Sequence, residues 1–284
     1  GQVLTTTLGN GVQGTYAYNT IGVSTSIKAA KGTASLLNIG YQNIDARGNI
    51  KNRNEQTTSQ SENFTYDSMN RLTTGVEYGE NGNILFKADA GTYQYEDSHP
   101  HAISSLSPTS NDVLPKLDLS VTYNSVRLPV QLSEGNKVYT LTYNGENSRV
   151  KSQFVQNGST VFTKYYCGPY EEILKGGTTR KNYYIYGGGQ IVAVYTEGAS
   201  DAGMYYFHND HLGSPWLITN ASGNEVQGLN FNAWGLRRDA TNWDNYSDLP
   251  EMKFDRGFTG HEHLDMFGLI NMNCLLYTSP SPRD

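Results

Sequence analysis

The sequence predicts an all-β protein made of successive antiparallel hairpins, with little helix. Composition is the first reason: the 284 residues include 21 tyrosines and 30 glycines, but only 17% are charged, which suits tyrosine-rich strands joined by glycine turns. A second reason is a series of short aromatic segments whose side chains alternate between two faces, such as residues 15–18. The third is a recurring turn pattern, in which Asp or Asn is followed three residues later by Gly or Asn.

This turn pattern recurs along the first 100 residues. It opens at Asn19, Asp45, Asp67 and Gly79, so that successive openings lie 26, 22 and 12 residues apart. A helical repeat would keep a longer and more constant period, whereas hairpins accept insertions in their turns. Each unit is therefore predicted to be one hairpin, in which the Asp or Asn side chain caps the turn and the Gly or Asn adopts a left-handed conformation. Hairpins pairing edge to edge would form one continuous, twisted and coiling sheet.

The middle of the chain is less regular. A segment that begins at His99 contains Pro108 and Pro115, which predicts a loop and an internal boundary over residues 101–120. The strand pattern returns over residues 121–200, where turns open at Asn124 and Asn144.

Three consecutive glycines at residues 187–189 raise the question of a phosphate-binding loop. Such a loop ends in Lys-Ser or Lys-Thr and leads into a helix, but here Gln190 leads directly into β-branched residues. A tight hairpin turn or a bulge is expected instead.

Three blocks near the C-terminus carry a family resemblance. Residues 205–215 form an aromatic strand followed by a polar turn, residues 232–237 repeat the turn pattern, and residues 258–273 close the series. In this order the blocks resemble the repeat-associated core of Rhs and YD-repeat proteins, which occur among bacterial wall-associated and polymorphic-toxin proteins. The resemblance assigns the repeat-associated core to residues 201–273.

The same resemblance implies a fold and a function for the whole chain. Residues 1–100 are expected to be degenerate YD repeats and residues 121–200 further YD-like repeats, which in this family wind into a hollow β-shell around the polypeptide's own C-terminal effector domain, often a toxin. We therefore expect a structural segment that helps enclose and deliver such an effector, its partner, and that is secreted or displayed on the bacterial surface. The family's self-cleaving aspartates belong downstream of Asn273, so no catalytic residue is assigned and no enzyme is expected.

Residues 274–284 depart from the family pattern. They resemble the translation of a sequencing adapter, so we exclude them from the fold prediction and expect a fragment that continues at both ends. Without Cys274 only Cys167 remains, which leaves no intrachain disulfide. No electropositive surrounding is evident for Cys167, so we expect a half-buried strand residue and not a nucleophile.

Charge and hydropathy exclude several classes of partner. The net charge is −6 and the isoelectric point about 5.5, without a run of Lys or Arg, which argues against nucleic-acid binding. No stretch approaches the roughly 20 apolar residues of a membrane span. No cofactor-binding motif is recognised.

Two polar clusters are candidate sites. His261, His263 and Asp265 could place imidazoles and a carboxylate on one strand, but the spacing is not that of a zinc protease, and a structural role is preferred. His208, Asp210 and His211 could suggest acid–base chemistry, but polar groups around a turn are more often each other's hydrogen-bond partners. The prediction is that neither cluster holds a metal or catalyses a reaction.

An alternative function is a cell-surface adhesin or carbohydrate-binding repeat module. The many tyrosines could form a stacking platform for sugars, although paired aromatic side chains are ordinary sheet stabilisation, worth on the order of 0.2 to 1 kcal/mol each. An adhesin predicts exposed aromatic patches on the outer face, whereas a shell wall predicts that aromatic rows pack into neighbouring strands.

Overall fold

The computed structural model describes residues 2–109, 119–244, 246–272 and 276–278, and their regular structure is almost entirely β. All strands pair antiparallel with their sequence neighbours, and helix is limited to two three-residue 3-10 turns. The predicted all-β fold of successive hairpins is therefore confirmed.

Three large sheets make up most of the chain. The first contains β1 (Thr5–Thr7), β2 (Gln13–Tyr18), β3 (Ser24–Lys31), β4 (Ala34–Gln42), β5 (Asn52–Glu55) and β6 (Gln60–Asn63). The second contains β7 (Val76–Tyr78), β8 (Ile84–Lys87), β9 (Gly91–Glu96) and β10 (His99–Pro108). The third contains β11 (Leu119–Tyr123), β12 (Pro129–Glu134), β13 (Lys137–Tyr143), β14 (Arg149–Gln156), β15 (Ser159–Cys167), β16 (Tyr170–Lys175), β17 (Thr178–Gly187), β18 (Gln190–Glu197), β19 (Gly203–Asn209), β20 (Pro215–Asn220) and β21 (Glu225–Gly228).

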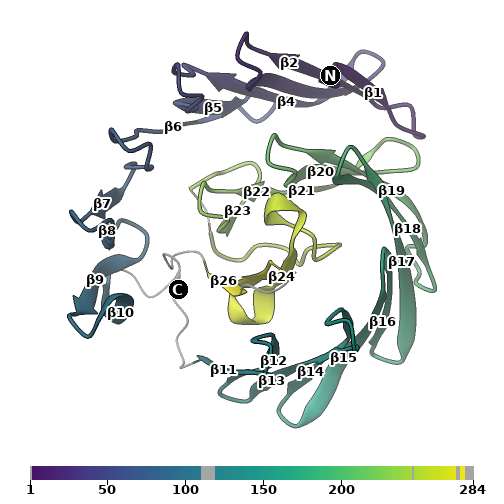
Figure 1. Ribbon diagram of the computed structural model, residues 1–284. Helices are drawn as coiled ribbons and strands as arrows, with labels where there is room; N and C mark the ends of the chain where they lie inside the picture. The colour runs from purple at the N-terminus through teal and green to yellow at the C-terminus, as the bar shows by residue number, and fades with distance from the viewer. Residues whose placement is uncertain (1, 110–118, 245, 273–275, 279–284) are drawn as a thin grey trace.

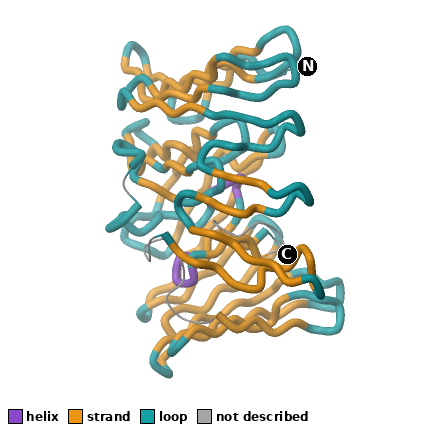
Figure 2. The backbone as a smooth tube through the Cα atoms, turned by 90° about the vertical axis from the view of Figure 1, so that its left-hand side faces the viewer, coloured by secondary structure: helices purple, strands orange, loops and turns teal. Residues whose placement is uncertain are grey.

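These three sheets form a curved wall around an interior segment, the described part of residues 229–278 (Figure 1). Viewed from the side, the hairpin turns lie along the two margins of the wall (Figure 2). The interior segment contains β22 (Asn230–Phe231), β23 (Arg237–Arg238), η1 (Phe258–Gly260), β24 (Glu262–Leu264), η2 (Asp265–Phe267), β25 (Leu269–Asn271) and β26 (Leu276–Thr278). This part of the wall thus surrounds polypeptide of the same chain.

One expectation about sheet organisation needs correction. The wall is divided into separate sheets and is not one continuous sheet, because between β6 and β7 the chain makes only a small hairpin with a single bridge, Tyr66 to Leu72. The expected start of the repeat-associated core at residue 201 lies within the third sheet, whose strands continue to Gly228 before the chain turns inward.

The loop predicted over residues 101–120 is also corrected. Residues up to Pro108 belong to β10, a strand with two register shifts against β9. Because β10 is an edge strand, proline can lie at its end without removing a ladder hydrogen bond. The rest of the expected loop, residues 110–118, lies outside the described residues, as do residues 273–275 and 279–284 of the C-terminal stretch.

Two local predictions, for the three glycines and for Cys167, can be compared with the structure. The three glycines form a tight hairpin turn, with Gly187 paired to Gln190 and positive φ at Gly188 and Gly189, as expected. Cys167 is a strand residue, as expected, but it is exposed and not half-buried, because it ends β15 at a hairpin turn.

The turn pattern has one repeated geometry. The opening side-chain oxygen accepts hydrogen bonds from the backbone N–H groups two and four residues later, and the residue three positions later has a positive φ. Eight turns share this arrangement, and they open at Asn19, Asp45, Asp67, Asn124, Asn144, Asp210, Asn220 and Asn232. The prediction of a capped turn followed by a left-handed residue is confirmed at Asn19, Asp45, Asp67, Asn124 and Asn144, whereas the turn predicted to open at Gly79 has a positive φ at Gly82 but no side-chain cap at its first residue.

Removing one of these caps should lower stability modestly. We expect Asn144→Ala to lower the free energy of unfolding by about 1 kcal/mol, because the N–H groups of Glu146 and Ser148 lose their acceptor. Urea denaturation measures the change. Glu146→Ala, in the same exposed turn, is the control and should stay within about 0.5 kcal/mol of the parent. Equal effects of the two substitutions would contradict the capping role.

Candidate functional site

The interior segment is the candidate functional site because it contacts every sheet of the wall. Trp243 packs with the core of the first sheet and with Trp216 of β20, and Trp234 packs against the core of the second sheet. Phe254 and Phe267 pack against two different regions of the third sheet. Four hydrophobic clusters therefore converge on one segment, which fixes its position relative to the wall.

A buried carboxylate, Glu262 of β24, connects this segment to the inner face of the third sheet. Its side chain is 1% exposed. Arg149 Nη2 of β14 lies 2.5 Å from one carboxylate oxygen. The other oxygen accepts hydrogen bonds from the Tyr166 hydroxyl at 2.9 Å and from Lys164 Nζ at 3.3 Å, both on β15.

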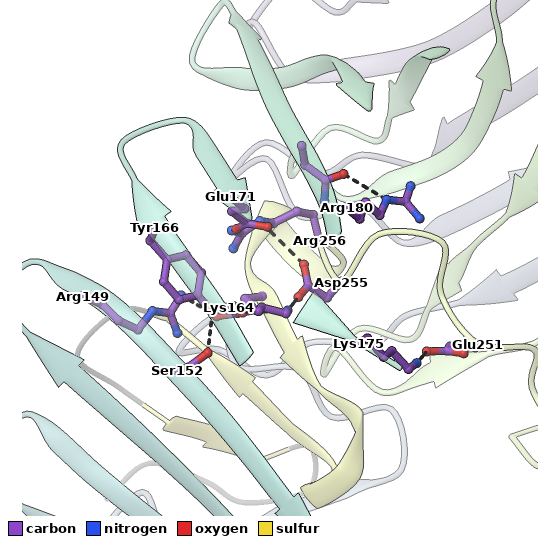
Figure 3. A network of polar contacts seen from close by, with 12 residues as sticks. Arg149, Ser152, Lys164, Tyr166, Glu171, Lys175, Arg180, Glu251, Asp255 and Arg256 are labelled. Carbon is purple, nitrogen blue, oxygen red and sulfur yellow. Dashed lines mark hydrogen bonds and ion pairs between the residues drawn. The ribbon is translucent and has the colours of Figure 1, made fainter. Parts of the chain in front are cut away.

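Further charges extend this contact into a network (Figure 3). Lys164 also forms an ion pair with Asp255, and the neighbouring Arg256 forms one with Glu171 of β16. Glu171 is 1% exposed and accepts a hydrogen bond from the Tyr184 hydroxyl at 3.2 Å. Positive and negative groups thus alternate across the junction between wall and interior segment.

The electrostatics of the network favour the ionised form of Glu262. Burial alone would raise the pKa of this carboxyl, but the charges of Arg149 and Lys164 hold it well below its usual range. Burial would lower the pKa of Lys164, but the carboxylates of Asp255 and Glu262 raise it above its ordinary value. The pKa of Asp255 is raised by burial and by the nearby negative charge of Glu262.

A second polar anchor joins the interior segment to the first sheet. Glu62 of β6 accepts hydrogen bonds from Arg238 Nη2 and Arg53 Nε, both at 2.7 Å. Arg53 Nη2 also donates to the Phe231 carbonyl at 2.8 Å. Burial would raise the pKa of Glu62, but the two arginines lower it. A third contact, from Lys137 Nζ to the Met266 carbonyl at 2.6 Å, fixes the far end of the segment.

The predicted polar cluster at residues 261–265 is split between two sides of a strand. Glu262 faces the wall, while His263 Nε2 accepts a hydrogen bond from the Phe258 amide at 2.9 Å and His261 Nδ1 lies 2.7 Å from Thr259 Oγ1. His263 Nδ1 is 3.7 Å from Asp265. Across the described residues, no group of three or more His, Cys, Asp or Glu side chains is placed to hold a metal ion.

His208, Asp210 and His211 are also separated, and the expectation that they bind one another is wrong. His208 Nε2 lies 3.0 Å from Thr219 Oγ1, and the His211 ring packs on Tyr41 with centroids 4.5 Å apart. The Asp210 carboxylate caps its own turn. His208 and His211 thus contact residues of other strands, and Asp210 stabilises its own turn.

The outer face of the third sheet carries a row of tyrosines. The ring centroids of Tyr170 and Tyr183 are 5.1 Å apart, and those of Tyr183 and Tyr195 are 6.1 Å apart. Tyr183 is 38% and Tyr195 39% exposed. The aromatic row therefore packs across neighbouring strands, as expected of a wall, and is also accessible, as expected of an adhesin.

Comparisons with known proteins identify the fold. No protein-family model matches the chain, and no curated protein sequence matches it. A crystal structure of TcdB2-TccC3 without its hypervariable C-terminal region matches with a TM-score of 0.74 and 14% identity over 98% of this chain. The Tc holotoxin pore of Photorhabdus luminescens, with the TccC3-D651A mutation, matches with a TM-score of 0.72 and 14% identity over 98% of this chain.

In both cases the chain spans 17% of the length of the protein it matches. A complex described as TcdB2-TccC3-Cdc42 also matches, with a TM-score of 0.68 and 15% identity. The chain thus has the β fold of a segment of these Tc toxin proteins.

Among the helices of the described residues, none is long and apolar enough to cross a membrane.

Proposed function

We propose that this chain is part of an Rhs-type shell that encloses and helps deliver a C-terminal effector domain. The observation that carries the proposal is the course of the chain: three sheets curve around the described part of residues 229–272, and β24 of this segment lies inside the wall (Figure 1). Polypeptide that continues from there would start within the enclosure. The fold likeness to Tc toxin proteins over 98% of the chain supports this role.

In this proposal the chain contains and delivers, and catalyses nothing itself. The interior segment acts as an anchor, because ion pairs and aromatic contacts attach it to all three sheets. The partner is the effector domain of the same polypeptide, and the assembled shell is secreted or carried on the bacterial surface.

Recovery of the parent gene and protease protection together test the proposal. We expect the reading frame to continue beyond Asn273 into a further domain, and that domain to resist protease in the folded full-length protein while the same domain expressed alone is cleaved. Equal cleavage of the enclosed and the isolated domain would argue against enclosure. Mass spectrometry of the products identifies which domain is cut.

A second candidate function, a carbohydrate-binding surface module, is favoured by one observation. The outer row of Tyr170, Tyr183 and Tyr195 is partly accessible, and its ring faces could stack on sugars. Neighbouring rings are tilted by 50° and 34°, however, and so do not form a flat platform. A reading frame that ends at Asp284 without a further domain would favour this second function over the shell.

A further inference from the structure

Lys164 and Asp255 form an amine–carboxyl pair between the wall and the interior segment. Lys164 lies on β15, and Asp255 lies 91 residues later, in the interior segment. Lys164 Nζ is in direct contact with Asp255 Oδ2 (Figure 3), and the two side chains are 9% and 20% exposed. Removing such charges from water is costly, and their mutual attraction often does not offset that penalty. A reaction that removes both charges would therefore recover free energy.

A second carboxylate, that of Glu262, approaches the same amine. Its Oε1 lies 3.3 Å from Lys164 Nζ, and the Tyr166 hydroxyl donates to this oxygen at 2.9 Å. Burial would raise the pKa of Glu262, but the charges of Arg149 and Lys164 hold it well below its usual range, so Glu262 stays ionised beside the amine. Among the ion pairs of the described residues, Lys164 is the one lysine with two carboxylates within ion-pair distance.

Asp255 is the carboxyl that can take a proton. Burial raises its pKa, and the negative charge of Glu262 adds to this effect against the opposing charge of Lys164. Direct contact lets Lys164 donate a proton to Asp255, which leaves a neutral amine beside a neutral acid. Burial lowers the pKa of Lys164, but the two carboxylates raise it above its ordinary value. The neutral pair is therefore the minor form, and a reaction between the two groups is expected to be slow.

We propose that Lys164 and Asp255 become joined by an intramolecular isopeptide bond. After the proton transfer, Lys164 Nζ attacks Asp255 Cγ, a C–N bond forms, and the C–O bond to the protonated oxygen breaks, so that one water molecule leaves. The ammonium and the carboxylate together contain all the atoms of the amide and of this water, so no further reactant is needed. The ionised Glu262 stabilises the positive charge that develops on the attacking nitrogen. The bond forms once and turns over no substrate.

Proximity makes this condensation possible. Groups held in a reactive geometry behave as if present at about 10⁵ to 10⁸ M, which amines and acids in free solution do not approach. The Phe162 ring, whose centroid lies 5.3 Å from Lys164 Nζ, adds an apolar surface beside the amine. The bond fastens the interior segment to the wall whether or not a further domain follows, so it is independent of the proposed function.

Mass spectrometry of the folded chain tests the bond. We expect an intact mass below the sequence mass by one water molecule, and a branched tryptic peptide in which Lys164 is joined to Asp255. Lys253 and Asp201 are the internal control, because they form an ion pair between the interior segment and the wall without a second carboxylate. These two residues should appear in separate peptides. The full sequence mass after prolonged incubation, with Lys164 and Asp255 in separate peptides, would overturn the proposal.

Two lysine variants locate the bond. Lys164→Arg keeps the positive charge but has no amine to acylate, so the chain should keep its full sequence mass. Lys253→Arg, the same change in the control pair, should lose one water molecule as the parent does. A branched peptide in Lys164→Arg would show that another amine reacts, and the assignment to Lys164 would then be wrong.

The role of Glu262 is tested by the rate of linkage. Cell-free synthesis gives the parent and Glu262→Gln a common starting time, and electrophoresis in SDS follows the linked fraction, because a cross-linked chain migrates faster. Glutamine keeps the size of the side chain without its charge, and we expect it to slow linkage about a hundredfold. Circular dichroism confirms that the variant is folded. Equal rates in the two folded proteins would refute stabilisation of the attacking nitrogen by Glu262.

Discussion

Glu262→Ala is expected to lower the free energy of unfolding by about 3 to 5 kcal/mol, because it leaves buried positive charges without their partner. Arg149 is only 15% exposed and forms its ion pair with this carboxylate, while Lys164 is 9% exposed and would keep only Asp255 as a partner. Urea denaturation followed by circular dichroism measures the loss. We further expect faster proteolysis within residues 229–272, since the substitution removes the Glu262 ion pairs between the interior segment and the third sheet.

The matched control is Glu251→Ala. Glu251 also belongs to the interior segment and pairs with Lys175 of the wall at 3.0 Å, but their side chains are 83% and 54% exposed. A surface pair of this kind contributes roughly 0 to 1 kcal/mol. If the two substitutions destabilise the protein equally, burial of the network is not what holds the interior segment.

Turns were predictable from the sequence because their geometry is local. The cap at Asn144 and the left-handed Asn147 lie three residues apart, and each residue type favours its conformation without help from the rest of the fold. Hairpins then follow in sequence order, which is the strand order observed in the sheets. The proline-containing segment before Pro108 was misjudged, because edge position, which depends on the assembled sheet, decides whether proline is accepted in a strand.

The ion-pair network was not predicted, because its members are far apart in sequence. Lys164 and Glu262 are separated by 98 residues, and only the curvature of the wall brings them together. One signal was present: Lys164 lies between Phe162 and Tyr166 on the same face of its strand, where a charge requires a partner. Strand alternation also places Glu262 on the opposite side from His261 and His263, so that its carboxylate reaches the wall while the imidazoles do not.

Acidification is expected to destabilise the third sheet at the position of His208, whose ring contacts Thr219 of β20. This imidazole is 7% exposed, and burial lowers its pKa to about 4 from an ordinary 6.5. Because the folded pKa is the lower one, the folded protein resists protonation between these values while the unfolded chain accepts the proton. Above about pH 6.5 this group does not lower the free energy of unfolding. As the pH falls from 6.5 to 4, protonation of His208 in the unfolded chain lowers the free energy of unfolding by about 3 kcal/mol.

His208→Gln should flatten this pH dependence, because glutamine can still contact Thr219 Oγ1 but does not titrate. The measurement is the free energy of unfolding at pH 7 and at pH 4.5 for the parent and the variant. His101→Gln, which removes an exposed imidazole, should keep the full loss seen in the parent. Carboxylates of the network, whose pKa values are lowered in the folded state, lose their stabilising contribution only at lower pH. Because burial also lowers the pKa of His211 and of His261, an unchanged slope in His208→Gln would assign the acid sensitivity between pH 7 and 4.5 to another buried histidine and not to His208.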